Sequence, residues 1–205
     1  MKKNQINELR ELLLEKKIKG VKSLALLIDP EKLDKQPSLD LLNQLSHGLS
    51  IDFFFVGGSL VDAKRLDQCL RRLKEVTKGN VPIVLFPGSV MQISDEADAI
   101  LFLSLISGRN PDLLIGQHVL AAPTLSKSNL EVLPVGYMLV NGGVGTSVEY
   151  ISQTIPIPHN KPDIAVATAL AGKYLGLPIF YLDAGSGAKH PVSPIMIKAV
   201  SEQLH

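Results

Sequence analysis

Short apolar runs alternate with helical segments along the chain, and this alternation limits the fold more than any other feature of the sequence. Continuous apolar runs are typical of strands that are buried on both faces, as in parallel sheets. The predicted strands cover residues 23–28, 51–56, 81–86, 99–103, 131–140 and 178–182. The predicted helices cover residues 4–18, 39–49, 61–77, 112–122, 161–175 and 193–204. The alternation predicts an α/β fold of parallel βαβ units with right-handed crossovers.

Two architectures fit this pattern, an open doubly wound sheet and a (β/α)8 barrel. A complete barrel typically needs about 250 residues, whereas this chain has 205 and provides six strand–helix units. The pattern alone therefore favours the open sheet. No composition shift or linker divides the chain, so we expect a single domain over residues 1–205.

Charge and composition exclude several classes of protein. Lysine and arginine total 21 against 20 aspartate and glutamate residues, which argues against a general nucleic-acid binder. No apolar run approaches the roughly 18 residues of a membrane span, so we expect no integral membrane segment. Cys69 is the only cysteine, so the chain cannot form an internal disulfide, which fits a reducing cytoplasm.

Polar residues and glycines gather where the predicted strands end, and in parallel α/β folds the ligand binds at the carboxyl ends of the strands. Asp29 follows the first strand, and its carboxylate suits a hard cation such as Mg²⁺. The alternative is a turn or N-cap aspartate before Pro30. Gly57, Gly58 and Ser59 follow the second strand, where Ser59 offers a hydroxyl to a metal or phosphate, or caps the next helix.

The stretch from Tyr181 to Lys189 is the most informative one. Its glycines at alternate positions after a strand predict a concave run of backbone donors for a phosphate, with Asp183 beside it. The alternative is a flexible loop. Arg109 either pairs with a diphosphate or faces water, and His118 is interpreted as structural.

The interval between Phe86 and Ala99 has hardly enough residues for a helix that covers a sheet. It either leaves an apolar flank open for an oily ligand or forms a short connection that neighbouring side chains close.

Six short motifs extend over most of the chain, from about residue 23 to residue 204. They are Leu27-Ile28-Asp29-Pro30-Glu31-Lys32, Phe55-Val56-Gly57-Gly58-Ser59, Leu85-Phe86-Pro87-Gly88, Ser104-Leu105-Ile106-Ser107-Gly108-Arg109-Asn110-Pro111, Gly136-Tyr137-Met138-Leu139 and Tyr181-Leu182-Asp183-Ala184-Gly185-Ser186-Gly187. Together they resemble the geranylgeranylglyceryl phosphate synthase family, and in detail its branch of larger oligomers. The resemblance implies a TIM barrel, which overrides the preference for an open sheet.

The resemblance also implies an activity, a cofactor and an assembly. Such an enzyme transfers the prenyl group of geranylgeranyl diphosphate, or of a similar prenyl diphosphate, to the 3-hydroxyl of sn-glycerol 1-phosphate. This is the first ether-bond step of ether-lipid synthesis. Mg²⁺ is the implied cofactor, a homo-oligomer between dimer and hexamer the implied assembly, and the cytoplasm the expected location.

Site residues follow from the same resemblance, position by position. Asp29 and Ser59 match the Mg²⁺ ligands, and Asp183 matches the catalytic carboxylate, which is glutamate in many members. The positions that match the glycerol-phosphate site are Tyr181, Leu182, Asp183, Ala184, Gly185, Ser186 and Gly187.

One part of the family pattern is missing from this sequence. The glycine-rich loop after a seventh strand and the Gly-Asn pair after an eighth strand have no counterpart before His205. We therefore expect a barrel without its last two βα units, and a natural chain that continues for about 40 to 50 residues. Two other functions stay open: a non-catalytic or impaired barrel subunit that keeps its oligomer surfaces, and a barrel enzyme that binds sugar phosphates.

Overall fold

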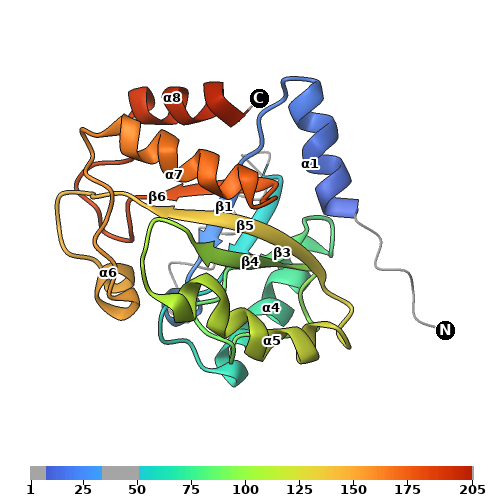
Figure 1. Ribbon diagram of the computed structural model, residues 1–205. Helices are drawn as coiled ribbons and strands as arrows, with labels where there is room; N and C mark the ends of the chain where they lie inside the picture. Colours follow the sequence, from blue (N-terminus) through green and yellow to red (C-terminus); the bar gives the residue numbers. More distant parts are fainter. Residues whose placement is uncertain (1–7, 34–50, 205) are drawn as a thin grey trace. The chain divides into compact units, whose positions relative to one another are not determined.

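The computed structural model describes residues 8–33 and 51–204, and the predicted helix over residues 39–49 lies outside them (Figure 1). The strands are β1 (Ala25–Ile28), β2 (Phe53–Val56), β3 (Ile83–Leu85), β4 (Ala99–Leu105), β5 (Glu131–Leu139) and β6 (Ile179–Asp183). The helices are α1 (Glu8–Ile18), α2 (Pro30–Leu33), α4 (Ala63–Thr77), α5 (Gln117–Leu125), α6 (Ser147–Ser152), α7 (Pro162–Tyr174) and α8 (Pro194–Leu204). A π-helical turn, η1 (Asp112–Gly116), runs directly into α5.

The strands form one sheet in the order in which they occur along the chain, β1-β2-β3-β4-β5-β6. The pairs β1–β2, β2–β3, β3–β4 and β5–β6 are parallel, with Ala25 opposite Phe53 and Val135 opposite Ile179. A doubly wound sheet reverses its strand order at a switch point, whereas a barrel adds each strand beside the previous one. The preference for an open sheet is therefore wrong, and the barrel topology is confirmed through its sixth strand.

The chain divides into two compact units, and β4 and β5 contribute residues to both. The first unit contains Met1–Leu101 and Ala121–Leu133. Its strands β2 and β3 are almost fully buried, as the continuous apolar runs predict. Helix α4 begins at the N-cap Asp62 and buries Leu66, Cys69, Leu70, Leu73 and Thr77, which recur at helical spacing on one face.

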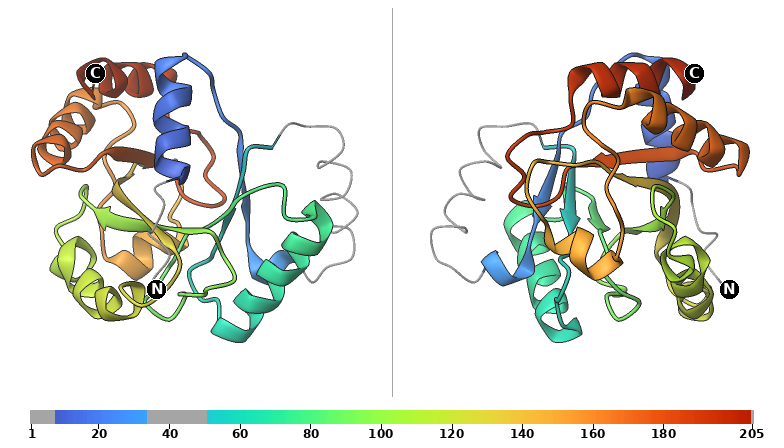
Figure 2. Two further views of the ribbon diagram at one scale, coloured as in Figure 1. Left: turned by 90° about the vertical axis from the view of Figure 1, so that its right-hand side faces the viewer. Right: turned by 60° about the vertical axis from the view of Figure 1, so that its left-hand side comes forward.

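The second unit contains Phe102–Leu120 and Pro134–His205. Helices α7 and α8 lie side by side in this unit (Figures 1 and 2). Its buried core consists of Met138, Val140, Ile157, Ala165, Ala169, Met196 and Val200. Phe180 and Leu182 of β6 pack against this core, which fixes the face of β6 that points toward the helices.

Three local features differ from the sequence-based expectation. The short helices α2 and α6 were not predicted, and the predicted helix over residues 112–122 is a π-helical turn followed by α5. Residues 86–98 form turns and no helix, in agreement with the shortness of this interval. Among the described residues, no helix combines the length and the apolar character that a membrane crossing requires.

Candidate active site

The first unit brings Asp29 next to the turn that follows β2. The backbone N–H of Gly57 donates to the carbonyl of Ile28 at 3.2 Å, so the β1–β2 ladder extends to the residue before Asp29. A Cβ placed on Gly58 would lie 3.3 Å from Oδ1 of Asp29. The carboxylate therefore packs against the Gly57-Gly58-Ser59 turn, in which Ser59 is half-buried.

Glycine is required where the turns after β2 and β3 meet. The N–H of Phe86 donates to the carbonyl of Val56 at 2.8 Å, and a Cβ on Gly57 would lie 1.8 Å from the Phe86 carbonyl oxygen. A Cβ on Gly88 would lie 2.7 Å from the carbonyl oxygen of Gly58. The two turns thus approach backbone to backbone, at a distance that no side chain allows.

The sequence left a turn or N-cap role open for both Asp29 and Ser59, and the structure shows such a role for Asp29 only. Oδ1 of Asp29 accepts a hydrogen bond from the N–H of Glu31 at 3.1 Å, so the carboxylate does stabilise the start of α2. Ser59, in contrast, is not the N-cap of the following helix. That position belongs to Asp62, whose Oδ1 accepts from the N–H of Arg65 at 2.9 Å.

The donor set in this part of the first unit fits Mg²⁺ in one binding mode. In the described part of the chain, no three histidine, cysteine, aspartate or glutamate side chains come together to hold a metal. Mg²⁺ prefers oxygen ligands and is often held by one or two carboxylates together with substrate phosphates. A single carboxylate, Asp29, beside the turn that carries the hydroxyl of Ser59 suits that mode, with a diphosphate completing the coordination.

The second unit holds Asp183 at the carboxyl end of β6 between two donors. The hydroxyl of Tyr137 donates to Oδ2 at 2.6 Å, and the backbone N–H of Gly185 donates to Oδ1 at 2.7 Å. Tyr137 is 6% exposed, and burial, followed by the charge of Asp183, raises the pKa of its hydroxyl. Tyr137 therefore stays protonated and keeps donating. The carboxylate is oriented at both of its oxygens.

The loop after β6 is joined by its contacts to neighbouring loops, and two of its glycines adopt positive φ angles. Gly185 and Gly187 have φ angles of 85° and 80°, a region that favours glycine. A Cβ on Gly185 would lie 2.6 Å from the side chain of Thr146. The N–H groups of Lys189 and His190 both donate to the carbonyl of Gly142, at 2.9 and 3.1 Å, which ties this loop to the one after β5.

Two backbone N–H groups of this loop are available to bind an anion. Within the ranges that the structure describes, no hydrogen bond occupies the N–H groups of Ser186 and Gly187, and both residues are exposed. Successive backbone N–H groups in a glycine-containing turn form a concave site for anions. The loop is therefore suited to a phosphate next to Asp183.

Successive side chains of β6 point to opposite faces of the sheet, so the other predicted residues of this strand lie on different faces. Tyr181 lies on the same face of the sheet as Asp183, and its ring centroid is 5.9 Å from that of Tyr137. Burial, followed by the charge of Asp183, raises the pKa of Tyr181. Leu182 packs against the helical core, so its side chain does not share a face with Asp183. Ala184 is half-buried and links the strand to the loop.

Arg109 is exposed, whereas His118 is buried. The guanidinium of Arg109 donates back to the carbonyl of Gly108 at 2.7 Å. His118 is buried, with Nε2 3.1 Å from the hydroxyl of Ser104 and its ring edge-on to Phe102 at a centroid distance of 4.4 Å. These contacts favour the structural interpretation of His118.

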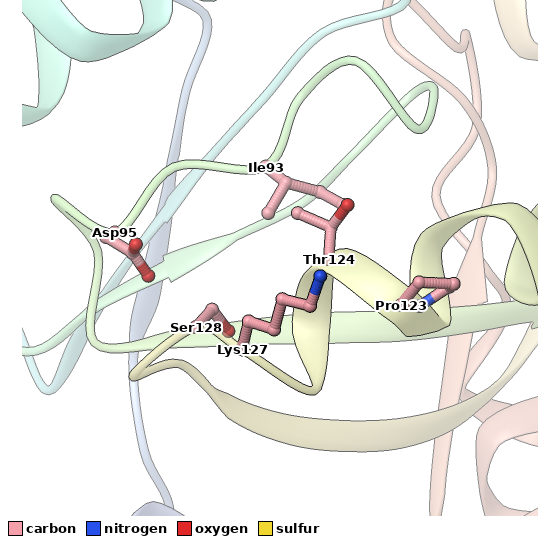
Figure 3. Close-up of a pocket in the computed structure, with 6 residues that line it drawn as sticks. All are labelled: Ile93, Asp95, Pro123, Thr124, Lys127 and Ser128. Carbon is pink, nitrogen blue, oxygen red and sulfur yellow. The ribbon is translucent and has the colours of Figure 1, made fainter. Parts of the chain in front are cut away.

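A hollow of about 300 Å³ in the first unit has none of the predicted site residues in its lining, which Figure 3 draws as sticks. Its lining residues are Ile93, Asp95, Pro123, Thr124, Lys127 and Ser128. Asp95 precedes β4, and Lys127 and Ser128 precede β5, so the hollow lies at the amino ends of these strands. Asp29 and Ser59 follow strands β1 and β2 at the opposite end.

Tyr137 is a site residue to which the sequence assigned no role. It lies within the Gly136-Tyr137-Met138-Leu139 motif, in the middle of an apolar strand. The available signal is the period-two spacing along β5. A phenol in a row of aliphatic residues, with Leu133 and Val135 before it, indicates a hydroxyl that needs a buried partner.

Comparison with known proteins gives consistent results. The model of the PcrB family matches residues 16–205. The chain is 49% identical over 198 residues to the geranylgeranylglyceryl phosphate synthase of Chitinophaga pinensis, which covers 97% of this chain and 77% of that protein. It is 43% identical over 174 residues to the protein of the same name from Methanothermobacter thermautotrophicus, which covers 85% of this chain and 69% of the relative.

Two solved structures have the same fold. The wild-type geranylgeranylglyceryl phosphate synthase from Thermoplasma volcanium matches with a TM-score of 0.80 and 33% identity, covering 90% of this chain and 72% of that chain. The enzyme of Thermoplasma acidophilum, crystallised with its substrate sn-glycerol-1-phosphate, matches with a TM-score of 0.83 and 29% identity. That match covers 100% of this chain and 79% of the other. These likenesses support the barrel topology that the strand order indicates.

Proposed function

The chain belongs to the PcrB family, and on this basis we propose that it transfers a prenyl group from a prenyl diphosphate to the 3-hydroxyl of sn-glycerol 1-phosphate. The observation that carries the proposal is the oriented carboxylate of Asp183 beside a loop with two available backbone donors. A hydroxyl acceptor that also bears a phosphate needs both features. The activity implied by the names of the relatives agrees with this chemistry.

The reaction exchanges one carbon–oxygen bond for another. The oxygen of the 3-hydroxyl attacks C1 of the prenyl chain, the bond from C1 to the diphosphate oxygen breaks, and its electron pair leaves with the diphosphate. The hydroxyl proton passes to Asp183. Placement of a general base of this kind typically contributes about 10² to 10⁴ in rate.

The proposal assigns glycerol phosphate to the second unit. The phosphate accepts from the backbone N–H groups of Ser186 and Gly187, while the 3-hydroxyl approaches Asp183. Tyr137 and Gly185 already occupy one lone pair on each carboxylate oxygen, so the carboxylate is held in place before the substrate arrives. Preorganisation of this kind avoids an ordering cost during the reaction.

The proposal assigns the diphosphate to the first unit, where Asp29 and Ser59 would hold Mg²⁺. When bound, the ion neutralises charge on the leaving diphosphate. Asp29 contributes the carboxylate, and the turn against which it packs, Gly57-Gly58-Ser59, contributes the hydroxyl of Ser59.

The prenyl chain is assigned to the connection between β3 and β4. Residues 86–98 form no covering helix, and two large apolar side chains on this side of the first unit are exposed, Leu60 at 79% and Met91 at 71%. An apolar environment protects the allylic cation character that develops as the carbon–oxygen bond breaks. A homo-oligomer and a cytoplasmic location stay predictions from the sequence.

Incubation of the protein with geranylgeranyl diphosphate, sn-glycerol 1-phosphate and Mg²⁺ tests the proposal. We expect mass spectrometry to detect the prenylated glycerol phosphate together with one equivalent of diphosphate. The enantiomer sn-glycerol 3-phosphate is the matched acceptor control and should give much less product. Equal use of both enantiomers, or no ether product with any prenyl diphosphate, would contradict the proposal.

A further inference from the structure

Gln92 is a buried polar residue that the proposed reaction does not use. It lies in the connection between β3 and β4, is only 1% exposed, and belongs to a segment of turns. A buried side-chain amide is costly unless its donors and its acceptor all find partners. Its position therefore depends on the groups that it contacts.

The amide of Gln92 joins the turns that follow β2 and β3. Nε2 donates to the carbonyl of Gly58 at 2.8 Å and to the carbonyl of Val61 at 3.2 Å. Oε1 accepts from the backbone N–H of Gly88 at 2.9 Å. Both amide hydrogens and the amide oxygen are engaged, and Ser59 lies between the two residues whose carbonyls are held.

The turns that Gln92 joins also touch each other directly. A Cβ on Gly88 would lie 3.1 Å from Cα of Ser59, and a Cβ on Gly58 would lie 3.3 Å from Oδ1 of Asp29. A shift of the Gly58 carbonyl would therefore displace Ser59 relative to Asp29. The turn itself contains two glycines, which give it no side chains with which to restrict its own backbone.

From this geometry we infer that Gln92 is a positioning residue, which fixes Ser59 beside Asp29 and so sets the affinity for the metal-bound diphosphate. The inference rests on the proposed function for its consequence in catalysis. Its structural part, the restraint on the turn after β2, is independent of the proposed function. We expect the effect to be confined to one substrate, because the hydrogen bonds of the Gln92 side chain go to Gly58, Val61 and Gly88, none of which is assigned to glycerol phosphate.

The substitution Gln92→Glu tests the inference with almost no change in shape. It replaces the donor Nε2 by an oxygen that faces two carbonyl groups, and it leaves the acceptor for Gly88 in place. Loss of two buried hydrogen bonds should raise the KM for prenyl diphosphate and the Mg²⁺ concentration at half-maximal rate by about tenfold. The KM for glycerol phosphate should change by less than about twofold.

Glu131→Gln is the matched control, because it is the reverse exchange at another buried site in the same unit. Glu131 is 6% exposed and accepts from the N–H groups of Leu9 and Arg10 at 2.8 and 2.9 Å. It begins β5, so it lies at the amino end of its strand. We expect this variant to lose stability without a preferential change in either KM.

A pH series adds a signature that a general loss of stability would not produce. Burial and the two facing carbonyls raise the pKa of the introduced carboxyl group, and its protonated form regains one donor. The KM of Gln92→Glu for prenyl diphosphate, relative to wild type, should therefore recover as the pH falls. Gln92→Met, which has no donor at any pH, should show no such recovery, and it replaces Gln92→Glu if that variant does not fold.

Hydrogen exchange reports on the restraint independently of activity. The amides of Gly58 to Leu60 and of Gly88 should exchange faster in the Gln92 variants, while those of β5 and β6 keep the wild-type rates. Unchanged exchange at these amides, or equal changes in both KM values, would overturn the inference. Absence of synthase activity in the wild-type protein would contradict the proposed function. The hydrogen-exchange rates would still decide whether Gln92 restrains the turn.

Discussion

The hydroxyl of Tyr137 donates a 2.6 Å hydrogen bond to Asp183, although the two residues are 46 positions apart in the sequence. Strands β5 and β6 are paired in parallel, and Tyr137 stands opposite Tyr181, two residues before Asp183. Tyr137 reaches along the sheet toward the carboxyl end of the neighbouring strand. A buried phenol of this kind orients the carboxylate and donates to it at any physiological pH, because burial raises the pKa of the hydroxyl.

The substitution Tyr137→Phe removes this donor and keeps the ring. A hydrogen bond to a charged group contributes about 1.5–3 kcal/mol, so we expect kcat to fall by roughly tenfold to a hundredfold. The KM for prenyl diphosphate should stay near the wild-type value, because the phenol contacts nothing assigned to that substrate. Steady-state kinetics with each substrate varied in turn measure both effects. An unchanged kcat would show that the hydrogen bond does not matter to the reaction.

Asp183→Ala should harm the use of glycerol phosphate far more than the binding of prenyl diphosphate. Loss of a placed general base typically costs about 10² to 10⁴ in rate. Single-turnover rates together with equilibrium binding of an unreactive prenyl diphosphate analogue separate the two effects. A normal rate combined with weakened binding of the analogue would assign Asp183 to the wrong substrate.

Asp29→Asn removes the charge that we assign to Mg²⁺ and keeps the size of the side chain. We expect turnover to fall sharply while the circular dichroism spectrum stays that of the wild type, and excess chelator should have the same effect on the unmodified chain. Asp95→Asn is the matched control, since Asp95 lies at the amino end of β4 and accepts only from the N–H of Asn129 among the contacts that the structure records for it. Full activity in the presence of chelator would exclude the assigned role.

Gly57→Ala tests the close approach of the turns after β2 and β3. The added Cβ would lie 1.8 Å from a backbone oxygen, which cannot rotate away as a side chain can. We expect the free energy of unfolding to fall by about 3 kcal/mol, at the upper end of the usual cost of overpacking. Gly145→Ala is the control, because no atom lies within 4 Å of the Cβ that it would add, and its change should stay within about 1 kcal/mol. Urea unfolding measures both values, and equal stabilities would contradict the geometry.

Burial lowers the pKa of His118 below its usual value of 6.5, an effect that the nearby backbone of Leu103 only partly offsets. The folded state therefore keeps the ring neutral at a pH where the unfolded chain already binds a proton. The contribution of the neutral His118 ring to the free energy of unfolding is complete above about pH 6.5. This contribution is lost as the pH falls toward the pKa of His118 in the folded state.

His118→Gln should remove this part of the pH dependence. We expect the free energy of unfolding of the variant to fall less than that of the wild type between pH 7.5 and about pH 5.5. His159→Gln, at an exposed position, is the control and should follow the wild-type profile. Parallel profiles for wild type and His118→Gln in urea unfolding at each pH would count against the role of His118.

Strands were predicted well from the sequence because burial on both faces produces continuous apolar runs. The run at residues 51–56 contains β2, and the run at residues 131–140 contains β5. The strand order could not be obtained in the same way, because the two candidate architectures share the same alternation. The short helix α6 was missed because its boundaries depend on the N-cap Thr146 and on a left-handed Gln153, which leave no periodic signal.

The candidate site was predicted only as far as its residues lie in motifs. Asp29, Ser59 and the loop from Asp183 to Gly187 follow strands and carry glycines or carboxylates, so they stand out locally. The spacing along β5 indicates that the hydroxyl of Tyr137 needs a buried partner, but Tyr137 and Gln92 act through contacts with residues 46 and 34 positions away, so no local pattern identifies those partners.

The turns at the carboxyl ends of the strands are coupled in pairs. Gln92 joins the turn after β2 to the turn after β3, and the carbonyl of Gly142 accepts from two residues of the loop after β6. A single loop taken from a relative would therefore lack the contacts with the neighbouring turn that shape it. Exchange of neighbouring loops together between members of the family should therefore transfer substrate specificity. A chimera in which a single loop is exchanged would carry the sequence of that loop without its conformation.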